Sequence, residues 1–199
     1  MVTIHNLTKS YQDLHVLEGV NLTLKDGRIY CLMAPSGGGK TTLLRILMGL
    51  ESADSGEIRG LEGRRLAAVF QEDRLCEAYT ALDNVMMTAA PGVTRDMARE
   101  ELRRLLPDES VERPVCTLSG GMKRRTAVCR AVLAFSHILI MDEPFTGLDG
   151  DTRQEVIRYI REKTVGKLVV LSTHQKEDAE ALGGELIGLS SHEHLFDIG

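Results

Sequence analysis

The chain has 199 residues, of which 43% are apolar, and this length suffices for one domain with a buried core. Its formal net charge is −5 and it has no basic tail, which argues against general nucleic-acid binding. No stretch approaches the ~20 consecutive apolar residues that a membrane-spanning helix needs, and the first residues lack the pattern of a secretory signal. We therefore expect a soluble, intracellular protein.

In the first part of the chain, short alternating and apolar runs predict strands. The first 25 residues alternate as antiparallel strands do, with a turn at Lys25-Asp26-Gly27. The apolar runs 28–34 and 67–71 predict two buried strands. Between them, the spacing in residues 40–50 predicts a helix whose apolar face carries four leucines: Leu43, Leu44, Leu47 and Leu50.

The character of the sequence changes from about residue 72 to residue 136, where we expect a small helical subdomain. The stretch "TALDNVMM" is one expected helix, and Thr94 is a plausible N-cap of the next. A third helix follows "SGG", and its spacing predicts a buried face of four residues: Val128, Ala131, Val132 and Phe135.

A strand–helix alternation resumes after this subdomain. The apolar runs 137–141 and 167–172 predict strands that are buried on both faces, and residues 151–163 predict an amphipathic helix between them. Strands that alternate with helices imply a parallel sheet of the doubly wound α/β class.

The four cysteines are far apart and include no C-x-x-C pair. This usage predicts buried, small apolar residues in a reducing compartment rather than disulfide or metal sites. The four positions are Cys31, Cys76, Cys116 and Cys129.

The stretch "APSGGGKTT" at 34–42 matches the phosphate-loop pattern G-x-x-x-x-G-K-[ST], except that Ala34 replaces the first glycine. Its backbone N–H groups and the start of the following helix can bind phosphates, Lys40 adds a full charge, and the Thr41 hydroxyl can bind Mg²⁺. We expect Ala34 to end the strand with a negative φ, so that its methyl group removes no phosphate contact. The alternative is a chance match in a glycine-rich turn. The nucleotide-binding candidates in this loop are Pro35, Ser36, Gly37, Gly38, Gly39, Lys40, Thr41 and Thr42.

Two carboxylates, Asp142 and Glu143, follow the apolar strand "HILIM". Ligands of open α/β sheets lie at the carboxyl ends of the strands, so Asp142 can hold Mg²⁺ through water. Glu143 can polarise a water molecule that attacks the γ-phosphate of a nucleotide. The alternative is an acidic turn before Pro144.

The stretch "LSGG" at 118–121 predicts a helix that begins after Ser119, and such a start is a second anion site. Taken alone, it reads as an ordinary serine N-cap followed by glycines. The basic run Lys123-Arg124-Arg125 reads as a solvated helix face.

Five motifs occur in a fixed order: the phosphate loop, "LSGG", "LIMDEP" (139–144), "GLD" (147–149) and "STH" (172–174). Together they resemble the ATP-binding cassette (ABC) family of transporter ATPases, and the resemblance extends from Tyr11 to His174. It implies a single domain over residues 1–199. The expected fold is a P-loop NTPase core with a parallel sheet flanked by helices, an N-terminal antiparallel β subdomain and the small helical subdomain.

The resemblance also implies roles for residues that the motifs alone do not explain. Tyr11 matches the aromatic residue that stacks on adenine, and the alternative is an ordinary strand tyrosine. Gln71 matches the glutamine that senses Mg²⁺ and the attacking water. His174 matches the histidine that contacts the γ-phosphate, although a histidine at a strand end is usually structural. Asp149 matches a loop that crosses the interface of a head-to-tail dimer, in which Ser119, Gly120 and Gly121 of one chain close over the phosphate loop of the other.

The function implied is that of an ATP-hydrolysing subunit, with ATP and Mg²⁺, that drives a separate membrane permease contacted around residues 72–90. The stretch "VFQEDRL" resembles the nitrate, sulfonate and taurine importers. The expected location is the cytoplasmic face of the membrane, and an extracytoplasmic substrate-binding protein would be an indirect partner. Two alternatives stay open: a soluble cassette ATPase that is not linked to transport, and a nucleotide-binding regulatory module without turnover.

Overall fold

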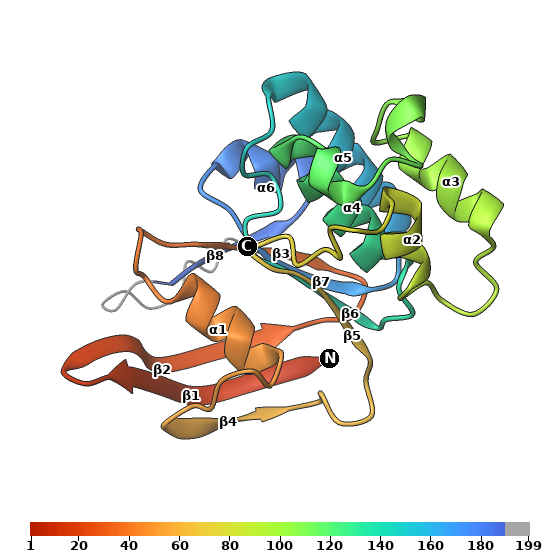
Figure 1. The fold of residues 1–199 in the computed structure, drawn as a ribbon. Coiled ribbons are helices and arrows are strands. Elements are labelled where there is room, and N and C mark those ends of the chain that lie inside the picture. Colours follow the sequence, from red (N-terminus) through yellow and green to blue (C-terminus); the bar gives the residue numbers. More distant parts are fainter. Residues whose placement is uncertain (190–199) are drawn as a thin grey trace.

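The computed structural model describes residues 1–189, which contain two β-sheets and six α-helices (Figure 1). The strands are β1 (Val2–Tyr11), β2 (Leu14–Leu24), β3 (Ile29–Met33), β4 (Ser55–Arg59), β5 (Leu66–Val69), β6 (Ile138–Met141), β7 (Leu168–Ser172) and β8 (Glu185–Gly188). The helices are α1 (Lys40–Leu47), α2 (Ala81–Met86), α3 (Arg95–Arg103), α4 (Gly120–Leu133), α5 (Gly150–Lys163) and α6 (Lys176–Leu182), with short 3-10 helices η1 (Asp108–Ser110) and η2 (Val115–Thr117).

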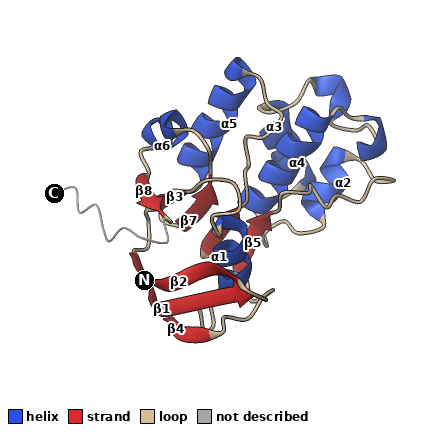
Figure 2. Ribbon diagram, turned by 90° about the vertical axis from the view of Figure 1, so that its left-hand side faces the viewer, coloured by secondary structure: helices blue, strands red, loops and turns tan. Residues whose placement is uncertain are grey.

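The larger sheet is parallel and has the strand order β5-β6-β7-β3-β8. Helix α1 lies on one of its faces, between it and the antiparallel sheet β2-β1-β4, whereas α4, α5 and α6 lie on the other face (Figures 1 and 2). This architecture confirms the predicted α/β fold with a parallel sheet flanked by helices and an N-terminal antiparallel part. Gly27, with a φ of +74°, lies in the predicted turn between β2 and β3.

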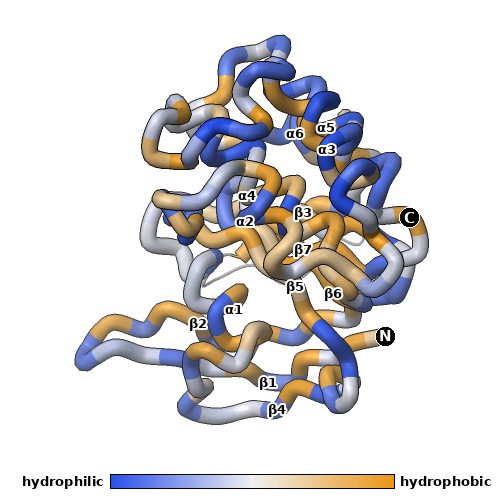
Figure 3. Tube along the Cα trace, turned by 45° about the vertical axis from the view of Figure 1, so that its right-hand side comes forward, coloured by the Kyte–Doolittle hydropathy of each residue, from blue (hydrophilic) through white to orange (hydrophobic). Residues whose placement is uncertain are grey.

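The central strands are buried on both faces, as their continuous apolar runs predict. Along β6, Ile138 and Ile140 pack in the cluster around α1, and Leu139 and Met141 pack in the cluster around α4 and α5. This alternation follows from the two-residue period of a strand. In Figure 3 hydrophobic residues gather along the central strands, while hydrophilic residues predominate on the outer helix α3.

Two of the predicted core positions are wrong. Leu50 is 48% exposed, because α1 ends at Leu47 and Gly49 reverses the chain with a φ of +69°. Phe135 is 49% exposed, because α4 ends at Leu133 and Ala134 is already extended. The guanidinium carbon of Arg65 lies 4.5 Å from the centroid of the Phe135 ring, so this half-exposed ring contacts a cation at the surface and is not part of the core.

The prediction that all four cysteines are buried holds for two of them. Cys31 and Cys129 are buried, and burial raises the pKa of each thiol to about 12. Cys76 and Cys116 are exposed. Cys76 lies in the irregular segment before α2, and Cys116 lies within the three-residue helix η2, so neither position belongs to a periodic pattern that is long enough to indicate burial.

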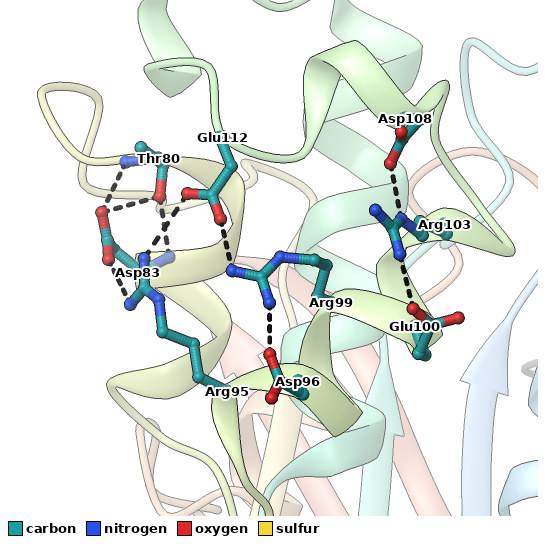
Figure 4. Close-up of polar contacts among 9 residues, drawn as sticks. All are labelled: Thr80, Asp83, Arg95, Asp96, Arg99, Glu100, Arg103, Asp108 and Glu112. Carbon is teal, nitrogen blue, oxygen red and sulfur yellow. Dashed lines mark hydrogen bonds and ion pairs between the residues drawn. The ribbon is translucent and has the colours of Figure 1, made fainter.

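The helical part begins with two threonine caps, at Thr80 and at the predicted Thr94. Successive arginines of α3 then hold the neighbouring segments, as Figure 4 shows: Arg95 pairs with Asp83 at 2.8 Å, and Arg99 pairs with Glu112 at 2.9 Å. These pairs are largely exposed, so each contributes little to stability. That residues 72–136 form one subdomain within a single domain 1–199 stays a prediction, and residues 190–199 lie outside the described residues.

Candidate functional site

The phosphate-loop candidate connects β3 to α1, which is the context that the motif requires. Gly37 and Gly39 adopt positive φ values of +79° and +81°, and the Gly38 N–H donates to the Pro35 carbonyl oxygen at 3.0 Å. Pro35, Ser36 and Gly37 are exposed. The solvent-exposed part of the turn is therefore Pro35–Gly37, and the buried Gly39 leads into the positive end of α1.

Lys40 is buried at the first position of α1, with only 6% of its surface exposed. Its ammonium group donates to the carbonyl oxygens of Ala34 at 2.7 Å and Pro35 at 3.3 Å. The positive charge is therefore held inside the loop, directed at its backbone. Thr41 is exposed beside it, and Thr42 is partly buried.

Ala34 follows the last residue of β3 and is not among the described non-glycine residues with positive φ. Its methyl group has a specific neighbour: a Cβ atom built on Gly38 would lie 2.7 Å from Ala34 Cβ and 3.0 Å from the Pro35 carbonyl oxygen. The side chain at 34 therefore excludes one at 38, so the two positions are coupled.

This coupling predicts the behaviour of three variants. Ala34→Gly should change ATP affinity little, whereas Gly38→Ser should weaken it, because the new Cβ collides with Ala34. In Ala34→Gly/Gly38→Ser the collision with the Ala34 methyl group is relieved, while the 3.0 Å approach to the Pro35 carbonyl oxygen remains in both backgrounds. A double-mutant cycle of ATP dissociation constants should therefore give a coupling of about 1 kcal/mol. Equal effects of Gly38→Ser in both backgrounds would contradict this account. So would a tenfold effect of Ala34→Gly alone, which corresponds to ~1.4 kcal/mol.

Asp142 and Glu143 follow β6, and Ser172 at the end of neighbouring β7 holds both. The Ser172 hydroxyl donates to Asp142 Oδ1 at 2.6 Å and accepts from the Glu143 N–H at 2.8 Å. Asp142 is only 4% exposed. Glu143 has a φ of +49°, a left-handed conformation that is unusual for a residue with a side chain. Such strain is frequent at functional sites.

His174, two residues beyond β7, reaches the carboxylate of Glu143. Its Nε2 lies 2.6 Å from Glu143 Oε1, and the Thr146 hydroxyl donates to Glu143 Oε2 at 3.2 Å. A cavity of about 230 Å³ lies beside these groups and is also lined by Arg153 and Ser172. The structure thus brings Asp142, Glu143 and His174 to one edge of the sheet. The Glu143 side chain is 20% exposed, so a water molecule in this cavity can reach its carboxylate.

Gln71 lies just beyond β5 and is exposed. The Asp142 N–H donates to the Val69 carbonyl oxygen at 2.8 Å, which places the start of this loop beside the carboxylates. The guanidinium group of Arg124 donates to the Gln71 carbonyl oxygen.

Ser119 is the N-cap of α4, and its hydroxyl accepts from the Met122 N–H at 3.3 Å. A Cβ atom on Gly121 would lie 3.5 Å from the Gly147 carbonyl oxygen, so this helix start borders the loop that leads to Asp149. Asp149 itself caps α5, and the Thr152 N–H, bound to its carboxylate at 3.0 Å, holds the Asp149 pKa below its ordinary value. Among residues 1–189, no hydrogen bond joins Ser119–Gly121 to the 34–42 loop.

Tyr11 ends β1 and is 43% exposed, next to Gln12 with a φ of +54°. The Lys9 ammonium lies 5.3 Å from the centroid of its ring. The ring is thus partly exposed, and no described contact joins it to the carboxylates.

Two supports of the site were missed by sequence reasoning. Ser172 could have been found, because it is a hydroxyl that closes an otherwise apolar strand. The second is the pair Arg153–Asp178, whose Nε–Oδ1 distance is 2.7 Å and which joins α5 to α6. Thr173 donates to the same carboxylate, so this pair fixes the backbone that carries His174. No local signal links residues 25 positions apart.

The loop 34–42 fits a phosphate-bearing ligand by its own geometry. A Cβ atom on Gly39 would lie 2.7 Å from both the Val16 carbonyl oxygen and a methyl group of Leu17, so only glycine lets the loop pass β2 here. With the Lys40 charge and the Asp142 carboxylate at the same strand ends, the donor set suits a nucleotide and a hard, oxygen-binding cation. Within residues 1–189, no helix combines the length and apolar character that crossing a bilayer requires.

Comparison with known proteins identifies the family. Its sequence profile, described as ABC transporter, matches residues 17–146. The sulfate/thiosulfate import ATP-binding protein CysA of Neisseria meningitidis serogroup A is 33% identical, over 94% of this chain and 58% of that protein. The aliphatic sulfonates import ATP-binding protein SsuB 1 of Nocardia farcinica is 37% identical, over 98% of this chain and 80% of that protein. The chain spans only 57–60% of the length of the sulfate/thiosulfate relatives.

Similar solved structures belong to the same family as these relatives. The dimeric structure of MJ0796, a bacterial ABC transporter cassette, matches with a TM-score of 0.82 and 28% identity, over 94% of both chains. A post-hydrolysis structure of the same cassette, bound to ADP and Pi, matches with a TM-score of 0.81, 28% identity and the same coverage of both chains. From its motifs, its fold and relatives that align along nearly its whole length, the chain belongs to the ABC transporter family.

Proposed function

We propose that this chain binds and hydrolyses ATP as the energy-supplying subunit of an ABC importer. The observation that carries the proposal is the contact between Glu143 and His174 at the strand ends where the phosphate loop also lies, with Oε1 and Nε2 2.6 Å apart. It puts a proton acceptor and a group that can bind a phosphate oxygen within reach of one ligand. The contact joins the ends of two adjacent strands, β6 and β7.

Each residue has a proposed part in this reaction. The loop Pro35–Thr42 binds the phosphates, and the Lys40 ammonium group turns toward them from the carbonyl oxygens of Ala34 and Pro35. Tyr11 stacks on the base. Thr41, Gln71 and Asp142 are the candidates to hold Mg²⁺, which supplies charge neutralisation of the phosphates when bound. Glu143 accepts the proton of the attacking water, and His174 orients the γ-phosphate.

The partners follow from the same family. Four residues, Ser119, Gly120, Gly121 and Asp149, are proposed to complete the site of a second copy in a head-to-tail dimer. This proposal is supported by the dimeric MJ0796 structure.

The permease is proposed to be a separate chain that contacts residues 72–90. This subunit would then lie on the cytoplasmic face of the membrane. Both named relatives are import proteins, which favours an importer, with a substrate-binding protein outside the membrane as an indirect partner.

The test is phosphate release by the purified chain, combined with co-purification from membranes. Phosphate release that depends on Mg-ATP, together with recovery of the chain with an integral membrane protein, is the expected result. A chain that binds ATP and releases no phosphate with or without membranes is a regulatory module instead. Hydrolysis without any membrane association points to an ATPase that is not linked to transport.

A further inference from the structure

Arg124, on the helix that Ser119 begins, holds the loop that carries Gln71. Its Nη1 donates to the Phe70 carbonyl oxygen at 2.6 Å, and its Nη2 donates to the Gln71 carbonyl oxygen. Its Nε lies 3.2 Å from Asp73 Oδ1. One side chain thus binds three groups within four consecutive residues of this loop, although the sequence had placed Arg124 on a solvated face.

The loop itself is compact and held mainly from α4. Arg130, on the same helix, donates to the carbonyl oxygens of Arg74 at 2.8 Å and Asp73 at 3.1 Å. Arg74 has a φ of +46°, and its guanidinium carbon lies 3.9 Å from the centroid of the Phe70 ring. Four hydrogen bonds from two arginines therefore join the backbone of residues 70–74 to α4.

The Arg124 side chain is buried, so its contacts with the loop differ from those of an exposed surface arginine. Its side chain is 7% exposed, and a charge at that depth is costly unless its donors are paired. Burial also raises the pKa of the Asp73 carboxyl, which the charge of Arg124 opposes. An apolar side chain would fill the same space, but it would leave the carbonyl oxygens of residues 70 and 71 without a donor.

We propose that Arg124 is a positioning residue for ATP hydrolysis, which fixes Gln71 relative to Ser119. One helix then serves two sites: its start engages the nucleotide of the partner chain, and Arg124 carries the resulting movement to Gln71 in the chain's own site. Gln71 reaches its working position when Ser119 is engaged. This inference rests on the proposed function, and in particular on Gln71 acting in hydrolysis.

The test is a double-mutant cycle with wild type, Arg124→Met, Gln71→Ala and the double variant. Arg124→Met should lower kcat by about tenfold to a hundredfold, as expected for a misplaced active-site group, while KM for ATP changes less than about threefold. In the Gln71→Ala background, Arg124→Met should have no further effect on kcat, because the residue through which it acts is gone. Arg124→Lys should recover part of the rate, since an ammonium group can still bind a carbonyl oxygen.

Arg125→Met is the matched control. This neighbouring arginine binds the carbonyl oxygens of Leu105 and Gly121 and does not touch the Gln71 loop. The factor by which Arg125→Met lowers kcat should therefore multiply with the factor for Gln71→Ala in the double variant. A melting curve of each variant reports whether it is folded, and if Arg124→Met does not fold, Arg124→Lys takes its place in the cycle.

Multiplying effects of Arg124 and Gln71, or a loss that appears in KM with kcat unchanged, would show that Arg124 only supports the fold. An unchanged kcat for Gln71→Ala would also overturn the proposal, while hydrolysis by the wild-type chain would leave the proposed function intact. Absence of hydrolysis in the wild type, by contrast, is a failure of the proposed function itself.

Discussion

Glu143→Gln is expected to lower the rate of ATP hydrolysis by about 10²–10⁴-fold while leaving Mg-ATP binding close to that of the wild type. An amide keeps the shape of the side chain but cannot accept a proton from water. The Glu143 side chain touches no residue of the phosphate loop among its described hydrogen bonds, so the loop should bind as before. Phosphate release and ATP titration measure the two quantities, and the stalled protein should elute as a dimer with ATP on a sizing column.

Glu180→Gln is the control, because it makes the same chemical change at an exposed position of α6. It should hydrolyse ATP at the wild-type rate. If Glu143→Gln stays within a few fold of wild type, another group activates the water, and the contact with His174 is only structural.

A mixture of Lys40→Ala and Ser119→Arg chains, each inactive alone, is expected to recover roughly a quarter of the wild-type hydrolysis rate. Lys40→Ala removes the charge that lies 2.7 Å from the Ala34 carbonyl oxygen, and Ser119→Arg blocks the start of α4. In a head-to-tail dimer, both defects of a mixed pair fall on one site and the other site stays intact. Random pairing makes about half of the dimers mixed, each with one working site of two, when the sites act independently.

Dilution provides the second measurement for this prediction. The wild-type rate per chain should rise with protein concentration, because the isolated cassettes must first pair. A flat rate per chain, together with no recovery in the mixture, would establish a catalytic monomer. Recovery without any dependence on concentration would indicate a dimer that does not dissociate over the range used.

The sequence predicts the central sheet well because its strands are buried on both faces. The runs 137–141 and 167–172 differ by one residue from β6 and β7, since burial on two sides leaves a continuous apolar signature. Helix ends were less predictable. Phe135 continues the spacing of α4 but follows its end, and only the tertiary position of Arg65 explains where its ring lies.

For the candidate site, order along the chain predicted which strand ends carry functional groups, but not how they touch. Asp142 was expected at the carboxyl ends of the strands, where ligands of open α/β sheets lie, and His174 was assigned to the γ-phosphate by the family resemblance. The serine between them and the Glu143–His174 contact depend on β6 and β7 being neighbours, which sequence does not state. Arg124 was misread for the same reason: its partners are 53 and 54 residues away.

The left-handed backbone conformation of Glu143 lowers the stability of the fold at the position of the proposed proton acceptor. Glycine adopts a φ of +49° freely, whereas glutamate does so at a cost of about 1 kcal/mol or more. A library randomised at position 143 and selected only for heat resistance should therefore be enriched in glycine and asparagine, neither of which can accept a proton. With the role proposed for Glu143, directed evolution of this cassette for heat resistance alone would remove the proton acceptor, so ATP turnover has to be selected at the same time.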